Sequence, residues 1–381
     1  MKTSDFDYEL DPQLIAQHPT DRREACRLLI MDRETGEMTH DHFYHIGDYL
    51  NPGDLLIIND TKVIPARLFG HRPGKEESIE VLLLRNTESS RWETLVKPGK
   101  KMKIGAEVQF GDLLEGRVID IADDGQRLIE FHYDGVWEEV LDALGTMPTP
   151  PYITEKLKDK SQYQTVYARV DGSAAAPTAG LHFSKQLIQE LKQKGIRFAS
   201  LTLHVGIGTF RPVKEDEIED HAMHAEYYEL PKETADAIRE TKARGGRVIA
   251  VGTTSTRTLE SVASKLGEVR EDSGWTDIFI YPGYQYKVID GIITNFHLPK
   301  SSLIMMISAL TQRERILHAY HVANALRYRF FSFGDAMLIV PRRDSLPRNA
   351  DRGELAHPED YQNEDEHEIL NWESYDKSSN L

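Results

Sequence analysis

The hydrophobic positions of the chain fall into two patterns, short apolar runs and longer stretches of helical spacing. The apolar runs end in turn residues and predict strands at 55–60 (LLIIND), 197–205 (RFASLTLHV), 247–252 (RVIAVG) and 336–340 (AMLIV). Helical spacing predicts helices at 184–194, 231–246, 302–310 and 316–330, and a further strand-to-helix junction after Gly252. Strands that alternate with helices in this way predict an α/β domain.

Between about Val63 and Tyr152 the pattern changes to short strands separated by Gly, Asp and Asn turns. The strands are IEVLLLR, WETLVKPG, AEVQFGD, EGRVIDI and RLIEFHY, and their close spacing predicts a small all-β barrel. The stretch 146–153 (TMPTPPYI) contains three prolines and predicts a stiff boundary. We therefore predict a discontinuous α/β catalytic domain at 1–62 and 152–343, an inserted β-barrel domain at 63–151, and an acidic, disordered tail at 344–381.

The segment Gly172–Phe183 (GSAAAPTAGLHF) is unusual because small side chains fill most of it. Three alanines would propagate a helix, but Pro177 removes a backbone donor and biases the residue before it toward extended geometry. A helix with Ser184 as its cap and Gly195 as its stop follows. Such a loop lets a ligand approach backbone N–H groups closely, although a tight loop that only packs would have the same composition.

Four other loops carry polar residues where predicted strands end. In open α/β sheets, ligands bind outside the carboxyl ends of the strands, so these loops predict one shared polar pocket. The G-x-G spacing in the second loop is weak, because the third glycine of a dinucleotide fingerprint is absent. The hydroxyls and arginine of the third loop suit a carboxylate or a polar sugar. The candidates are Asp60, Thr61 and Arg67 in NDTKVIPAR, Gly206 and Gly208 in HVGIGTFRP, Thr253, Thr254, Ser255 and Arg257 in GTTSTRT, and Asn295 and His297 in TNFHLPKSS.

Composition is that of an ordinary soluble globular protein, with 40% hydrophobic and 28% charged residues. The single cysteine, Cys26, excludes an internal disulfide and, beside an apolar run, is expected to be a packed small side chain. With no apolar signal core and no membrane span, we expect a cytoplasmic protein. The oligomeric state is left open, with a monomer as the default.

The net charge of −16 does not exclude a nucleic-acid partner, because half of it lies in residues 344–381. Basic residues cluster elsewhere, although such clusters are more often solvated surface than a phosphate track. If a nucleic acid binds, we expect the cluster KPGKKMK to contact it, through Lys97, Lys100, Lys101 and Lys103.

Other kinds of catalytic site are disfavoured. His221, His224 and Glu226 have H-x-x-H-x-E spacing, but metalloprotease helices place two histidines four residues apart, so hydrogen-bonding or acid–base roles are favoured and no metal is predicted. The chain also has no G-x-x-x-x-G-K-[ST] loop and no G-x-S-x-G elbow.

Seven long segments together resemble the S-adenosylmethionine:tRNA ribosyltransferase-isomerase family of queuosine biosynthesis. The resemblance covers residues 1–343 and implies an α/β domain interrupted by a β-barrel. The acidic tail lies outside it. The segments are PGDLLIINDTKVIPARLFG, GSAAAPTAGLHF, LTLHVGIGTFRPV, HAMHAE, GTTSTRTLES, TNFHLPKSSLIMMISA and YRFFSFGDAMLI.

The resemblance implies that the ribosyl part of S-adenosylmethionine, rather than its methyl group, is transferred to 7-aminomethyl-7-deazaguanine at the tRNA wobble position. Isomerisation then gives epoxyqueuosine, with release of adenine and methionine. S-adenosylmethionine is consumed as a substrate, so no separate cofactor is implied. The chemistry requires a base that removes a proton beside the sulfonium and an acid that protonates the departing adenine.

Applied to the matched segments, this chemistry suggests residue roles. His182, His204 and His297 are the candidates for proton transfer, with acid and base not assigned among them. Arginine or a helix N-terminus suits the methionine carboxylate, and an aromatic face suits the sulfonium. The expected substrate contacts are Thr253, Thr254, Ser255 and Arg257 (carboxylate or ribose), Asp60 and Asp335 (sugar hydroxyls or substrate amine), Gly180, Gly206 and Gly208 (close backbone approach), Phe183, Phe210 and Phe296 (adenine or sulfonium), and also Thr61, Arg67, Pro177, Thr178, Thr209 and Asn295.

Two other functions are weighed against this one. A methyltransferase has only the weak Gly206/Gly208 pair in its support. A noncatalytic RNA-binding module could use the barrel and its lysines, but it would not need polar residues gathered at strand ends.

Overall fold

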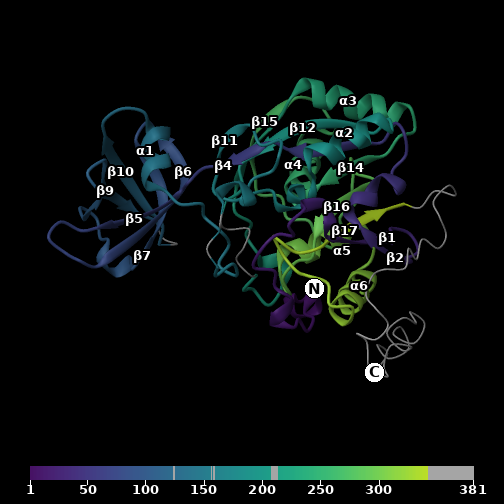
Figure 1. Ribbon diagram of the computed structural model, residues 1–381, viewed down its shortest axis with the longest axis horizontal. Helices are drawn as coiled ribbons and strands as arrows, with labels where there is room; N and C mark the ends of the chain where they lie inside the picture. Colours follow the sequence, from purple (N-terminus) through teal and green to yellow (C-terminus); the bar gives the residue numbers. More distant parts are fainter. Residues whose placement is uncertain (123–124, 156, 158, 207–212, 342–381) are drawn as a thin grey trace.

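The structure is a computed structural model that describes residues 1–122, 125–155, 157, 159–206 and 213–341. The predicted acidic tail at 344–381 lies outside the described residues, as do Gly208, Thr209 and Phe210 of the predicted site. Figure 1 shows a large α/β body on the right and a smaller barrel on the left. In the part of the chain that the structure describes, no helix has the length and apolar character that crossing a bilayer requires.

The α/β body is built on a nine-stranded sheet. Its strands are, in spatial order, β15 (Asp272–Thr276), β13 (Glu226–Leu230), β12 (Arg197–Leu203), β3 (Leu55–Asn59), β14 (Val248–Val251), β16 (Gly291–Asn295), β17 (Ala336–Val340), β1 (Arg27–Asp32) and β2 (Met38–His42). β12, β3, β14 and β16 run parallel, whereas β17 runs antiparallel to β16 and parallel to β1. Four carboxyl strand ends therefore meet at one edge, together with the starts of β17 and β1.

Helices cover both faces of this sheet, because its strands are apolar on both sides. In β3, Leu55 and Ile57 pack into one core and Leu56 and Ile58 into the other. The first core is completed by α3 (Lys232–Ala243), α4 (Gly252–Leu266), α5 (Ser302–Leu310) and α6 (Arg313–Ala325). The second is completed by α2 (Lys185–Gln193) and the 3-10 helix η4 (Phe43–Asp48).

The smaller part is a closed six-stranded barrel with its own apolar core. Alternate residues of each strand point inward, as Ile79, Val81 and Leu83 do. The helix α1 (Trp137–Leu144) packs on this core through Val140 and Leu141. The barrel strands are β5 (Arg67–His71), β6 (Ser78–Glu88), β7 (Arg91–Lys97), β8 (Glu107–Phe110), β9 (Leu114–Ile121) and β10 (Arg127–Tyr133).

A two-stranded parallel sheet joins the two parts of the molecule. β4 (Thr61–Val63) follows β3 and leads into the barrel, and β11 (Val170–Ser173) lies on the returning chain and pairs with β4. β11 then leads into the small-residue segment, whose second half is the 3-10 helix η7 (Thr178–His182). The remaining 3-10 helices of the described residues are η1 (Thr3–Phe6), η2 (Pro12–Leu14), η3 (Arg23–Ala25), η5 (Gly99–Lys101), η6 (Lys160–Tyr163) and η9 (Ile218–Asp220).

The predicted fold class, an α/β domain with an inserted all-β barrel, is confirmed. The helix after the small-residue segment is capped as predicted, since the Ser184 hydroxyl accepts the Leu187 N–H at 3.1 Å. The domain boundaries at 62/63 and 151/152 stay a prediction.

The predicted helix at 316–330 is wrong at its end. α6 ends at Ala325, and Arg327 adopts φ +54°, a left-handed conformation that does not continue a helix. The chain after it is extended enough for Phe330 to bridge to Ile15. Tyr328 and Phe330 are fully buried in the first core, so they belong to tertiary packing rather than to a helix.

Candidate functional site

A pocket of about 70 Å³ lies where the parallel strands end. Its walls come from four of the five predicted loops, with Pro177 and Thr178 on one side and Thr253 and Thr254 at the start of α4. Asn295, Phe296 and His297 follow β16 and form another wall. The pocket thus brings together the small-residue segment and three of the four strand-end loops, whereas no residue of the fourth loop, NDTKVIPAR, lines it. The other lining residues are Tyr152, Ala176, Ala179, Val205, Gly252, Thr294, Leu298, Ser301, Leu303, Phe331 and Ser332.

Asn295 connects the loops that form this pocket. Its amide Nδ2 donates to the Thr178 hydroxyl at 3.0 Å and to the Phe331 carbonyl at 3.2 Å. Its Oδ1 faces His182 Nε2 at 2.9 Å. Because Asn295 is buried, these bonds replace water and fix the relative positions of three segments that are distant in sequence.

His182 lies behind the pocket wall rather than in it. Its Nδ1 is 3.2 Å from Cys26 Sγ and its Nε2 bonds Asn295, so both ring nitrogens are occupied. Burial lowers the pKa of His182 to about 4 and raises the pKa of the Cys26 thiol. The pair is therefore neutral at pH 7, and Cys26 is the packed residue that the sequence predicted.

His297 lines the pocket but is also held at both ring nitrogens. Tyr320 Oη accepts the backbone N–H of His297 at 2.9 Å and lies 3.3 Å from Nδ1, and Thr294 Oγ1 lies 3.0 Å from Nε2. Each ring nitrogen of His297 therefore already faces a hydroxyl group of the protein. Burial lowers the pKa of His297 to about 3, so this ring is a neutral polar wall.

His204 lines a second, larger cavity of about 580 Å³ between the α/β body and the barrel. Its Nδ1 is 2.8 Å from the Thr61 hydroxyl, and no hydrogen-bond partner of Nε2 is found among the described residues. Its pKa is lowered, chiefly by burial, so it is neutral at pH 7. Val205 lines both this interdomain cleft and the small pocket, so the two cavities are neighbours. Of the three predicted histidines, His204 is the one with a ring nitrogen that has no hydrogen-bond partner among the described residues.

Arg257 is paired within the protein. Its guanidinium forms a buried ion pair with Glu226, and both side chains are almost fully buried. Glu226 also accepts the Gly206 N–H at 2.8 Å. Arg257 Nε has no hydrogen-bond partner among the described residues, although it is buried. A carboxylate ligand would therefore meet an arginine already neutralised by Glu226.

The two predicted aspartates connect segments that are distant in sequence, and Arg67 is paired between two strands of the barrel. Buried Asp60 accepts bonds from Thr202 at 2.7 Å and from Arg169 at 2.7 Å. Asp335 accepts the backbone N–H of Arg27 at 2.9 Å. Arg67, in β5, pairs with Glu80 at 3.1 Å. None of these three side chains lines the small pocket.

The glycine and aromatic residues predicted to contact the substrate also lie in different places, some packed inside the protein and some at the pocket. A Cβ at Gly180 would lie 2.0 Å from the Tyr167 hydroxyl, so this glycine admits the chain's own tyrosine. Phe183 is fully buried against Phe43 in the second core. Phe296 lines the pocket. The Ser255 hydroxyl bonds the Val251 carbonyl at 3.0 Å within α4.

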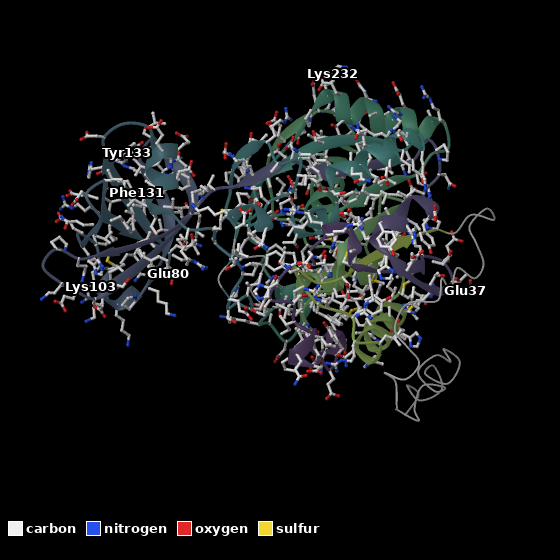
Figure 2. All side chains as sticks on the ribbon, viewed as in Figure 1. Glu37, Glu80, Lys103, Phe131, Tyr133 and Lys232 are labelled. Carbon is white, nitrogen blue, oxygen red and sulfur yellow. The ribbon has the colours of Figure 1, made fainter. Side chains whose placement is uncertain are left out.

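The predicted lysine cluster lies on the barrel. Lys97 ends β7, Lys100 and Lys101 lie in η5, and all four lysines are exposed. Lys101 Nζ is 3.8 Å from Glu77. Figure 2 shows Lys103 at the lower end of the barrel in this view.

Two aromatic residues that line the pocket, Phe331 and Tyr152, were not predicted from the sequence. Phe331 has φ +70°, a strained conformation for a bulky residue, and is held by a bond from its N–H to the Phe296 carbonyl at 3.1 Å. Tyr152 packs on it with ring centroids 4.7 Å apart. Tyr152 belongs to the proline-rich stretch that was interpreted only as a boundary. A left-handed phenylalanine has no sequence signature.

The fold and its pocket define an α/β protein with an inserted barrel and a pocket at the carboxyl ends of its strands, the place where open α/β sheets bind ligands. A family model described as "Queuosine biosynthesis protein" matches residues 3–339. The S-adenosylmethionine:tRNA ribosyltransferase-isomerase of Finegoldia magna is 57% identical over 340 residues, which cover 89% of this chain and 98% of that protein. The protein of the same name from Caldanaerobacter subterraneus subsp. tengcongensis is 58% identical over 341 residues, covering 89% and 100%.

A crystal structure of S-adenosylmethionine tRNA ribosyltransferase from Thermotoga maritima is similar at a TM-score of 0.52 and 41% identity, and the match covers 88% of this chain and 100% of that one. The chain belongs to the queuosine biosynthesis protein family, and it is an enzyme of that family. The predicted resemblance is confirmed. The roles assigned to single residues stay predictions.

Proposed function

We propose that the enzyme transfers the ribosyl group of S-adenosylmethionine to 7-aminomethyl-7-deazaguanine at the wobble position of tRNA and isomerises it, giving epoxyqueuosine-tRNA, adenine and methionine. S-adenosylmethionine is a consumed substrate here, not a resident cofactor. The observation that carries the proposal is the convergence of Thr178, Thr253 and His297, from three of the family-like segments, on one pocket at the strand ends.

The sizes of the two cavities suggest where the reaction takes place. The pocket of about 70 Å³ is too small for all of S-adenosylmethionine, because ligand sites for such molecules span roughly 300–1,000 Å³. The neighbouring cleft of about 580 Å³ can admit a nucleotide of the tRNA. We assign the reacting centre to the region beside Val205, where a ribosyl group held at the pocket can reach a base held in the cleft.

His204 is the best-supported candidate for proton transfer. Its neutral ring can accept a proton at Nε2, while Thr61 orients the ring through Nδ1. A base of this kind can remove the proton beside the sulfonium, whose positive charge makes that proton more acidic. His182 and His297 are assigned to positioning and wall roles, because their ring nitrogens already have partners.

The exposed lysines of the barrel are proposed to contact tRNA phosphates. Lys97, Lys100 and Lys103 have no carboxylate within 4 Å among the described residues. Contacts between lysine and phosphate release counterions, so this part of the affinity should weaken as salt is raised.

The test is turnover with S-adenosylmethionine and a tRNA that carries 7-aminomethyl-7-deazaguanine at the wobble position. The expected result is release of free adenine that depends on this tRNA, with a heavier nucleoside in the digested tRNA. A tRNA with unmodified guanine at that position is the matched control and should release no adenine. Methylated tRNA with S-adenosylhomocysteine would instead support a methyltransferase, and binding without turnover would support an RNA-binding module.

A further inference from the structure

A row of flat side chains crosses the interdomain cleft from the barrel to the strand ends. The Arg85 guanidinium of β6 lies over the Trp275 ring of β15, 4.9 Å from its centroid. Trp275 meets Tyr227 edge-on at 5.6 Å, and Tyr227 stacks on His204 with centroids 6.1 Å apart and planes 20° apart. The row therefore ends at the histidine proposed to transfer protons.

Trp275 is exposed in a way that suggests a ligand. It is 50% exposed, although a tryptophan is a large apolar side chain that is usually much more buried. It lies on β15, the outer strand of the nine-stranded sheet, and lines the cleft. In Figure 1, β15 lies on the side of the α/β body that faces the barrel.

The contact between the Arg85 guanidinium and the indole is weak enough to be displaced. The guanidinium is also paired with Glu93 on the neighbouring strand β7. The Glu93 carboxylate contacts the edge of the guanidinium, at Nε and Nη2. Both residues of that ion pair are partly exposed, and an exposed cation–π contact contributes only about 0.5–1 kcal/mol. A competing flat group can therefore take the place of the guanidinium on the indole.

The charges around the cleft favour a neutral ring over a phosphate. Four carboxylates line the cleft, those of Glu93, Glu138, Asp171 and Glu226, and Arg85, which Glu93 neutralises, is the one lysine or arginine among its described lining residues. Asp171 and Glu226 are paired with Lys62 and Arg257. Among the described residues the cleft therefore offers a phosphate no unpaired lysine or arginine, whereas an uncharged nucleobase of any kind can stack on an indole. Protein recognition of single-stranded RNA loops commonly uses such stacking.

We propose that an unpaired base of the tRNA anticodon loop stacks on Trp275, in place of the Arg85 guanidinium that covers the indole in the free protein. This inference rests on the proposed function, because tRNA is the substrate named there. The stacked base anchors the loop, so that the target nucleotide reaches His204 along the same row of rings.

The test measures binding of an anticodon stem-loop RNA, with 2-aminopurine in the loop, to the full chain. Trp275→Ala should weaken binding about 5- to 100-fold and abolish the quenching of 2-aminopurine fluorescence, whereas Trp275→Tyr should restore most of both. Arg85→Ala removes the guanidinium but keeps the indole, so quenching should persist. Phe69→Ala is the matched control, since Phe69 is an aromatic of 53% exposure on the barrel that does not line the cleft.

Binding by Trp275→Ala as tight as by the wild type would overturn the inference. The inference would also be overturned if Trp275→Ala and Arg85→Ala had equal losses of affinity, of quenching and of Tm. Arg85 and Trp275 would then form only a contact between the barrel and the α/β body. Turnover by the wild type is measured alongside. If the wild type stacks the base on Trp275 but shows no turnover, the proposed function is contradicted and the stacking site is not.

Discussion

At the scale of single residues, the three histidines that the sequence predicts equally for proton transfer have different environments in the fold. The partners that occupy His182 lie 156 and 113 residues away in the chain, at Cys26 and Asn295. No local spacing reveals such contacts. The residue types and the strand-end positions could be predicted from the sequence, but the state of each ring nitrogen is decided by tertiary packing.

His204→Ala should lower kcat by about 10²- to 10⁴-fold, the usual contribution of one proton-transfer group, with Tm little changed. A general base works when neutral, and burial lowers the pKa of His204. The acid limb of the wild-type profile of kcat/KM should therefore fall below pH 6.5, the ordinary histidine value. Steady-state kinetics from pH 5 to 8 measure kcat and the pH profile of kcat/KM, and thermal unfolding measures Tm.

His221→Ala is the control, because His221 bonds Glu215 at 2.8 Å and lines neither the pocket nor the cleft. A His204→Ala enzyme with kcat within about 3-fold of the wild type would remove His204 from the chemistry.

At the scale of elements, the strands and helices with strong periodicity were predictable, and those decided by packing were not. The strands predicted at 197–205 and 247–252, which are β12 and β14, follow from apolar runs in the sequence. Neither β13 (EYYEL) nor β15 (DSGWT) is a continuous apolar run, and both pair at the edge of the sheet beyond β12. The end of α6 was missed because burial of Tyr328 and Phe330 outweighs their helical spacing.

The small-residue segment owes part of its composition to packing within the protein. Gly180→Ala should destabilise the fold by about 1–3 kcal/mol, because its new Cβ would meet the Tyr167 hydroxyl and the Thr165 methyl group. Urea unfolding of the variant measures the free energy of unfolding. Combining it with Tyr167→Phe, which deletes the clashing oxygen, should recover part of the loss.

Gly206→Ala is the matched glycine control, since its Cβ would lie 3.7 Å from Glu226 Oε1, the nearest atom among the described residues. If Gly180→Ala were as stable as the wild type, close approach of Tyr167 would not explain this glycine, and room for a ligand would become the better account.

At the scale of the whole molecule, the neutral buried histidines make the fold sensitive to acid. The folded-state pKa values of His182 and His297 are about 4 and about 3, below the ordinary value near 6.5. The unfolded chain therefore binds more protons, so stability is full above pH 6.5 and falls as the pH drops toward 4.

We expect each ring to account for a loss of about 3–5 kcal/mol over its full titration. His182→Asn cannot be protonated, so its unfolding free energy should change less between pH 7 and 4.5 than that of the wild type. The difference in slope isolates His182 from the carboxylates, which titrate in both proteins. Equal slopes would mean that His182 is not buried as a neutral ring.

The proposed function needs both the barrel and the α/β body, because tRNA is proposed to reach the pocket at the strand ends through the cleft between them. The most direct test follows two labels in S-adenosylmethionine, one in the ribosyl carbons and one in the methyl group, during turnover with tRNA that carries 7-aminomethyl-7-deazaguanine. If the ribosyl group is transferred, the ribosyl label enters the tRNA and the methyl label leaves as methionine. Methyl label in the tRNA, with the ribosyl label left in S-adenosylhomocysteine, would contradict it.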